Sequence, residues 1–503
     1  EIRIRDWSSD VCSSDLAGAT ISVASMLSLT GDLTILDAGD QVTIGQLGFT
    51  DSGTVAITNA RAGVTFTGNV RATSFSVAAM ATGSTLLFAD GKTVEFSSFS
   101  SPATDWNLDV RSQNFAVTNA VTLANTGTRS LGNQSTDNLV FTAGLTATGS
   151  ATSIAGTFST ANAPVTLTDV TLTAATRLTT GNSAASDVTI GAVTAAGFDL
   201  TINAGSNAGA AVNISSLSNA AAFLLVSGGT LNFTAAVSAT SVTVQNISTS
   251  VTFGGNLTAA TLTMPAGSYS LALLGSGTTI TNPVSFAGTG GLTLGDGGDA
   301  IVFNGGFSTS TSTVNLNAAI TTSDDPVSIS ALSITGASSI RTLGGNLTLG
   351  TVSLGSNTLA LATSTGTITV SGSVTGAGTL SLQESGSSGP VNLLGNLSIG
   401  TLSSFSTAYP LALTGTSVTV TNPVSLTNLS SVTLGDGGDT LTFNGGLSVV
   451  GSATTVSAAI VTSADPVVLG TVLLAGTSSI ATAGGSLSTG TINGSAALTV
   501  TAG

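Results

Sequence analysis

The stretch GTITVSGSVTGAGTLSLQ, residues 366–383, decides the fold class of this 503-residue chain. In an extended backbone, Ile368, Val370 and Val374 would point to one side and the Ser and Thr residues between them to the other. This two-residue period of β-branched side chains is typical of a strand with one buried face. The Gly-Ala-Gly triplet at 376–378 supplies the backbone freedom of a tight turn. The stretch therefore predicts short strands separated by glycine turns.

The composition of the whole chain supports the same interpretation. It contains 62 glycines, and 41% of its residues are apolar but only 7% are charged. With so few Lys, Glu and Arg residues to cover exposed helix faces, helix is disfavoured. The longest apolar runs, such as 220–226, are far shorter than the ~20 residues that a membrane-spanning helix needs. The sequence predicts an all-β protein with no transmembrane helix.

A long internal repeat organises the chain. TNPVS at 281–285 returns at 421–425, and LGDGGD at 294–299 returns at 434–439, so the two copies differ by 140 in residue number. A degenerate copy lies upstream at an offset of 162 to 163 in residue number, where Asp137 matches Asp299. We interpret residues 17–223 as a region with this degenerate repeat, and residues 224–363 and 364–503 as two copies of one unit.

Apolar side chains within the unit recur roughly once per 20-residue stretch, at Ile280, Ile301, Ile320, Ile340, Leu359, Leu380, Ile399 and Val420. A coil of this length cannot bury its apolar side alone, but a stack of coils can. The pattern predicts a parallel β-helix (β-solenoid) of roughly 20-residue coils, and a tandem β-sandwich is the alternative. On this interpretation the 140-residue unit is seven whole coils, so its deletion would keep every later residue in the same rotational phase.

The first sixteen residues differ from the rest. DWSSDVCSSDL, residues 6–16, resembles the in-frame translation of a sequencing adapter. We interpret residues 1–16 as an adapter-derived artefact and expect them to contribute nothing to the fold and to make no defined contacts. The single cysteine, Cys12, lies in this segment.

The net charge of −15 predicts that the chain does not bind nucleic acid, since no basic stripe exists to neutralise phosphates. The chain also has no histidine and a single lysine, Lys92, so an activated serine or threonine nucleophile cannot be assembled from the usual residues. We predict that it is not an enzyme, with no catalytic residues and no cofactor.

One pair of acidic residues lies in a glycine-rich turn that occurs twice. Asp296 and Asp299, repeated as Asp436 and Asp439, lie in turns similar to calcium-binding nonapeptides. The motif occurs only once in each copy of the long repeat, so neighbouring coils lack partner carboxylates. We therefore expect solvated turns and no metal site.

The pair Asp324–Asp325 could act in glycoside hydrolysis, but the second copy has Ala464 in place of the first carboxylate. We expect a structural turn there.

Outward threonines and isolated aromatic residues suggest two further kinds of site. Thr367 and Thr369 resemble part of an ice-binding array, but such Thr-x-Thr pairs do not recur at one fixed position of the repeat. Trp106, Tyr269 and Tyr409 are too isolated to form a carbohydrate platform. The two tyrosines are equivalent in the two copies of the repeat, and we expect them to pack the same corner twice.

The stretches at 366–383 and 341–354 (RTLGGNLTLGTVSL) resemble coils of filamentous-haemagglutinin-like and autotransporter-type bacterial β-strand-repeat proteins. The likeness extends over nearly all of residues 17–503. It implies a structural or adhesive region of a large secreted or outer-membrane-associated protein at the cell surface, which acts as spacer and contact surface. Its partner would be a surface receptor, a glycan or a matrix component, and lateral self-association is compatible with such a surface.

One observation leaves the secretion route open, and one alternative function remains. The N-P-N-G-type motifs of two-partner-secreted members do not occur, so the secretion route is not determined. The alternative function is a non-catalytic part of a carbohydrate-active β-helix enzyme.

Overall fold

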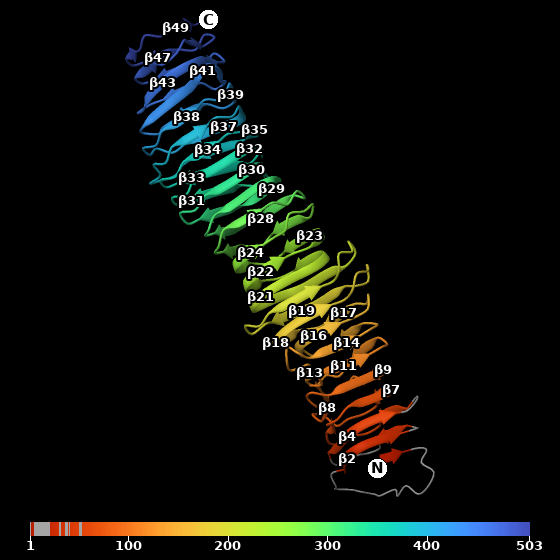
Figure 1. Cartoon of the computed structure of the whole chain (residues 1–503). Helices are drawn as coiled ribbons and strands as arrows, with labels where there is room; N and C mark the ends of the chain where they lie inside the picture. The colour runs from red at the N-terminus through yellow and green to blue at the C-terminus, as the bar shows by residue number, and fades with distance from the viewer. Residues whose placement is uncertain are drawn as a thin grey trace. The chain divides into compact units, whose positions relative to one another are not determined.

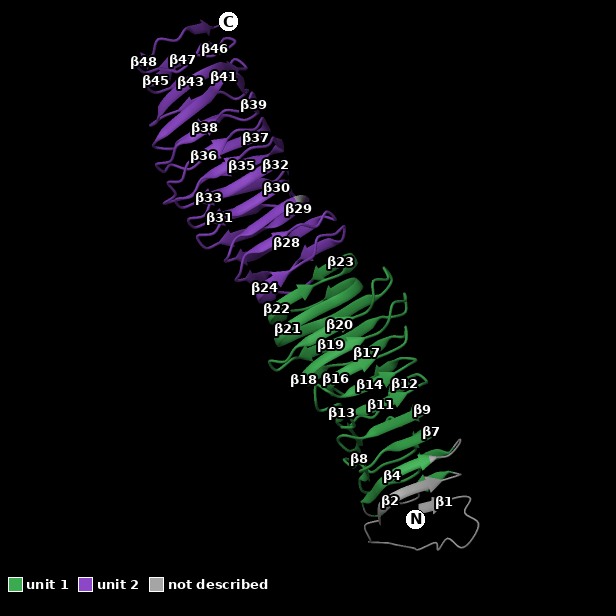
Figure 2. Cartoon of the chain, viewed as in Figure 1, with its two compact units in different colours: residues 1–253 green, residues 254–503 purple. Residues whose placement is uncertain are grey.

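The structure is a computed structural model that describes residues 2–4, 21–29, 32–35, 39, 41–49 and 53–502. In this part of the chain every regular element is a β-strand, and no helix has the length and apolar character of a membrane span. The chain divides into two compact units, residues 1–253 and 254–503 (Figure 2).

The strands of unit 1 run, in chain order, as β1 (Ile2–Ile4), β2 (Ile21–Leu29), β3 (Leu33–Ile35), β4 (Val42–Phe49), β5 (Thr54–Ile57), β6 (Val64–Phe66), β7 (Val70–Val77), β8 (Thr85–Phe88), β9 (Thr93–Ser100), β10 (Asn107–Val110), β11 (Asn114–Val117), β12 (Val121–Leu123), β13 (Arg129–Leu131), β14 (Asn138–Phe141), β15 (Leu145–Ala147), β16 (Thr152–Ser159), β17 (Val165–Leu167), β18 (Val170–Thr179), β19 (Val188–Thr194), β20 (Leu200–Asn203), β21 (Ala211–Phe233), β22 (Val237–Val244) and β23 (Ile247–Phe253).

The strands of unit 2 follow as β24 (Leu257–Thr263), β25 (Ser270–Leu273), β26 (Gly277–Ile280), β27 (Val284–Phe286), β28 (Leu292–Phe303), β29 (Phe307–Thr322), β30 (Val327–Ile334), β31 (Ser338–Thr342), β32 (Leu347–Gly355), β33 (Thr358–Thr363), β34 (Ile368–Val370), β35 (Val374–Leu382), β36 (Val391–Leu393), β37 (Leu397–Ser404), β38 (Leu411–Leu413), β39 (Ser417–Val420), β40 (Val424–Leu426), β41 (Ser431–Phe443), β42 (Leu447–Val449), β43 (Ala453–Thr462), β44 (Val467–Leu469), β45 (Val472–Leu474), β46 (Ser478–Ala481), β47 (Leu487–Thr489), β48 (Ile492–Asn493) and β49 (Leu498–Thr501).

Within each unit the chain winds as a parallel β-solenoid, as the sequence predicts (Figure 1). Each coil of unit 2 contributes strand segments to three faces, two of which we call A and C. Strands in successive coils pair in parallel, so the strand edges inside the stack are satisfied and the inward apolar side chains form one core. The inward residues of face A are Leu271, Leu292, Val314, Leu332, Val352, Val374, Leu397, Val418, Leu441, Ile460 and Ile480. Those of face C are Val284, Phe307, Val327, Leu347, Ile368, Val391, Leu411, Val432, Thr454 and Val472.

The average coil is slightly longer than the sequence predicts, and coil length varies. Seven steps along face A take the chain from Leu271 to Val418, which is an average of 21 in residue number per step. Single steps range from 18 in residue number, between Val314 and Leu332, to 24, between Arg71 and Glu95 in unit 1. The 140-residue repeat is therefore six and two-thirds coils. The prediction that it is seven whole coils is wrong.

The reason is that the eight apolar anchors chosen from the sequence do not lie in one row. Ile301 does pair with Ile320, and Ile320 with Ile340. Ile280, however, pairs with Phe303 rather than Ile301. Each coil carries several inward apolar residues at near-equal spacing, so spacing alone cannot say which of them stack.

The inward and outward assignment from the sequence is confirmed. Ile368, Val370 and Val374 are buried, whereas Thr367 and Thr369 are only half-buried. The core of unit 1 carries a chain of phenylalanines: Phe66 stacks on Phe88 with ring centroids 5.4 Å apart, and further rings follow along the stack. Such ring pairs add to the burial of apolar surface.

The expectation that residues 1–16 make no defined contacts is wrong for one short stretch. Strand β1 pairs antiparallel with β3, so that Ile2 lies opposite Ile35. Backbone pairing at a free strand edge needs no particular side chains, which is why composition could not exclude it. Residues 5–16 lie outside the described residues, and their adapter origin stays a prediction.

Candidate functional site

Buried aspartates brace the two LGDGGD turns. The Oδ2 atom of Asp299 accepts hydrogen bonds from the backbone N–H groups of Asp296 at 2.7 Å and Gly297 at 3.3 Å. The equivalent bonds of Asp439 measure 2.6 and 3.2 Å. Both side chains are buried. These carboxylates stabilise the turn from inside by binding its own N–H groups.

The degenerate copy uses the same device with different residues. Asp137 is buried, and its Oδ2 accepts from the backbone N–H groups of Asn133 at 2.9 Å and Gln134 at 3.0 Å. The turn here reads LGNQSTD and is one residue longer. The sequence match of Asp137 to Asp299 therefore reflects a shared brace, a role that the motif alone does not reveal.

The calcium alternative finds no ligand set in the part of the chain that the structure describes. Asp296 and Asp436 are exposed, whereas the buried carboxylates of Asp299 and Asp439 face the turn. Among the described residues, no three His, Cys, Asp or Glu side chains gather as ligands of one metal ion would.

The Asp324–Asp325 pair lies in a tight turn. Asp324 is exposed, and the backbone carbonyl of Asp325 accepts a hydrogen bond from Thr322 Oγ1 at 2.7 Å. Thr462 makes the same 2.7 Å bond to Asp465 in the second copy, where Asp324 is replaced by Ala464. The turn closes in the same way with one carboxylate or two, which fits a structural role for the threonine.

The three large aromatic residues lie inside corners. Trp106, Tyr269 and Tyr409 are all buried, and Tyr269 Oη donates to the carbonyl of Pro265 at 2.7 Å. Burial raises the pKa of each tyrosine to about 12. Tyr269 and Tyr409 occupy equivalent places two residues before an inward leucine, so the same local corner is packed twice. It lies before face A in one copy and before face C in the other.

A buried arginine distinguishes the Trp106 corner. Arg129 lies where the other two corners have Leu292 and Val432, and its guanidinium donates to the carbonyl of Leu123 at 2.6 Å and to that of Ser150. Desolvation lowers its pKa. The cation is held by backbone carbonyls inside the corner, away from any ligand that could approach from solvent.

Outward polar side chains line up along face A. Thr293, Asn315, Ser333, Ser353, Thr375, Ser398, Thr419 and Thr442 follow one another in successive coils. Strict Thr-x-Thr pairs do not recur there, but uncharged hydroxyl and amide groups do, at one position of the face. The sequence hides this row because coil length varies.

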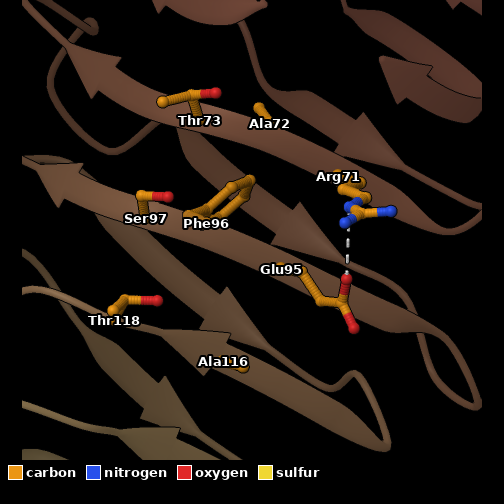
Figure 3. Close-up of a pocket in the computed structure, with 8 residues that line it drawn as sticks. All are labelled: Arg71, Ala72, Thr73, Glu95, Phe96, Ser97, Ala116 and Thr118. Atoms are coloured by element: carbon orange, nitrogen blue, oxygen red, sulfur yellow. Dashed lines mark ion pairs between the residues drawn. The ribbon is translucent and has the colours of Figure 1, made fainter. Parts of the chain in front are cut away.

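A hollow on the surface lies over β7, β9 and β11 in unit 1 (Figure 3). It is an open groove of about 300 Å³. Arg71 and Glu95 border one side, with Arg71 Nε 3.6 Å from Glu95 Oε2. Thr73, Ser97 and Thr118 lie on the other side.

Strand pairing explains how these residues meet. Arg71 is the register partner of Glu95, and Glu95 that of Ala116, so the three lie in adjacent coils on one outward row. Beneath them Ala72 and Phe96 face the core. The resulting surface offers hydrogen-bond donors and acceptors of both charges beside hydroxyl groups.

The sequence reasoning missed this groove. Arg71 and Glu95 are separated by one long coil of the solenoid, and the sequence does not show how long that coil is. In a chain with so few charged residues, a cation and an acid one coil apart are a usable signal, but only once the local coil length is known.

Comparison of the chain with protein-family models, with curated proteins and with solved structures finds no match.

Proposed function

We propose that this chain is a structural and adhesive region of a large protein displayed at, or secreted from, a bacterial cell surface. In this role its coils act as spacer and contact surface. The observation that carries the proposal is the different use of polar groups inside and outside the solenoid. Inside, Asp299 and Asp439 are engaged by backbone N–H groups of their own turns. Outside, face A presents an uninterrupted row of uncharged hydroxyl and amide groups.

Such a surface suits many weak contacts better than one strong one. An exposed hydroxyl gains only about 0.5–1.5 kcal/mol net from a hydrogen bond, because water competes for it. A row of such groups at a spacing of ~4.8 Å can engage a repetitive partner at many points, and the contacts then add up. The paired strands keep the row in register without disulfides.

The proposal is tested with microbeads that carry the full chain. Adhesion would be measured on epithelial cell layers, mucin, collagen and purified bacterial envelopes, with beads carrying the heat-unfolded chain as the matched control. We expect folded beads to adhere to at least one surface several times better than the control. Adhesion no better than the control on every surface would overturn the adhesive role, and so would release of soluble sugar from the surfaces by the protein.

A further inference from the structure

We propose that the groove over β7, β9 and β11 binds a neutral saccharide chain that lies across successive coils (Figure 3). This inference rests on the proposed contact function and names the chemistry of one contact.

The first support is the row of hydroxyl groups. Thr73, Ser97 and Thr118 are exposed and come from three successive coils, so they follow one another at about 4.8 Å. Backbone hydrogen bonds hold the ends of this row, because the N–H groups of Thr73 and Thr118 donate to carbonyls of the preceding coils at 2.9 and 3.1 Å. Within the described residues the three hydroxyls have no protein partner, so each can donate to and accept from a ligand.

The second support is the ion pair. The side chains of Arg71 and Glu95 are 75% and 53% exposed, and they approach through a single pair of atoms. The remaining guanidinium N–H groups and carboxylate lone pairs are open to solvent. A sugar diol both donates and accepts, so it can bridge an arginine and a glutamate in a way that a purely anionic or purely cationic ligand cannot.

Charge and size define the ligand class further. The pair is neutral as a whole and the chain carries −15, so a polyanionic saccharide is repelled. The volume of about 300 Å³ is at the lower limit for a small-molecule site, and the groove is open along the coils. Phe96 lies below it but is only 3% exposed, so it gives little stacking surface. The ligand is therefore a short run of neutral sugar units held mainly by hydrogen bonds.

The test is calorimetric titration of the full chain with cellotetraose, maltotetraose, chitotetraose and tetragalacturonate. We expect at least one neutral tetrasaccharide to bind and the acidic one to bind more weakly. Glu95→Gln should weaken binding about tenfold, because it removes a charged acceptor. Thr118→Val should weaken it less.

The matched control is Glu384→Gln, which breaks the exposed Arg341–Glu384 ion pair in unit 2 and should leave binding unchanged. All three variants should melt like the parent. Exposed ion pairs contribute little to stability, and Thr118 is itself an exposed side chain. The inference is overturned if no tetrasaccharide binds, if the acidic one binds best, or if Glu95→Gln and Glu384→Gln bind alike. Beads carrying Glu95→Gln separate the two proposals. If the titrations show no saccharide binding but these beads still adhere to a surface, the contact function stands and the saccharide site is rejected.

Discussion

Strands β25–β28 and β38–β41 are two copies of one arrangement on different faces of unit 2. Leu271 pairs with Leu292 on face A, whereas Leu411 pairs with Val432 on face C. These pairs occupy the same positions in the two copies of the repeat, yet the second copy is turned by one face. The repeat therefore preserves the contacts that each segment makes, but not the face of the solenoid on which the segment lies.

The two copies differ inside one corner. Asn428 Nδ2 donates to the carbonyl of Tyr409 at 3.0 Å and to that of Ser431 at 3.1 Å. The first copy has Gly288 at this place, beside Tyr269 and a small cavity of about 10 Å³. The Trp106 corner of unit 1 resembles the second copy, because Asn125 donates to the carbonyl of Trp106 at 3.0 Å. The same corner is thus found with a buried asparagine amide, as at Asn428 and Asn125, and with a glycine, as at Gly288.

The largest effect is expected from deletions that test the repeat itself. Removing residues 284–423 joins Pro283 to Val424. Residues 254–283 then take the place of residues 394–423 as the coil on which the chain from Val424 onwards stacks. We expect a shorter solenoid that melts like the parent, because each coil contacts mainly its neighbours. Its later coils should be rotated by one face, a third of a turn, about the solenoid axis. Removing residues 284–433 shifts turns into strand places and should abolish the cooperative melt. Circular dichroism and thermal melts of the two deletion variants measure the difference. If both variants melt alike, the phase of the coils is not what organises this chain.

A smaller loss is expected at the buried brace. Asp439→Ala leaves two backbone N–H groups of the turn without their acceptor, which costs about 1–3 kcal/mol. Asp436→Ala removes an exposed carboxylate from the same turn and should change the unfolding free energy by less than about 0.5 kcal/mol. Urea unfolding of both variants measures the difference. If the two cost the same, the brace is not what stabilises this turn, and Asp299→Ala repeats the test in the first copy.

The tyrosines of the two copies should titrate together. Burial raises the pKa of Tyr269 and Tyr409 to about 12, whereas an unfolded chain has tyrosine pKa values near 10. The neutral hydroxyls therefore favour folding fully below pH 10, and this contribution is lost as the pH rises from 10 through 12. The ultraviolet absorbance of tyrosinate and thermal melts over this range measure both effects. Tyrosinate that forms near pH 10 before any unfolding would show that the corners are open to water.

The smallest effect is expected from making the first corner like the second. A Cβ atom at Gly288 would lie 3.5 Å from its nearest neighbour, the carbonyl oxygen of Gly267, so the backbone accommodates the Cβ of Gly288→Asn, and the amide group must take the place that Asn428 has in the second copy. The new amide can donate to the carbonyl of Tyr269, and the change also restricts the unfolded chain, for a gain of about 1 kcal/mol. The reverse change, Asn428→Gly, should lose a similar amount, and urea unfolding of both variants measures the two effects. A destabilised Gly288→Asn variant would show that the two corners are not equivalent.

The sequence by itself determined the fold class, the 140-residue repeat and, in the alternating stretch at 366–375, which side chains face the core, but it did not determine the burial of Asp299 and Asp439 in turns that were expected to be solvated. Strict alternation at 366–374 settles the burial of Ile368 and Val370, because a two-residue period allows only one side of a strand to be apolar. The match of Asp137 to Asp299 likewise identified residues that the structure shows in one role.

Only the tertiary structure decided the rest, because stacking is set by contacts between coils whose lengths differ. These unequal coils turn the 140-residue repeat into six and two-thirds coils, and no anchor spacing reveals that Ile280 pairs with Phe303. The same variation hides the polar row of face A. It also hides the groove, where Arg71 and Glu95 meet because their strands are register partners across one long coil. Local pattern fixes the direction of a side chain, whereas register between coils fixes its neighbours.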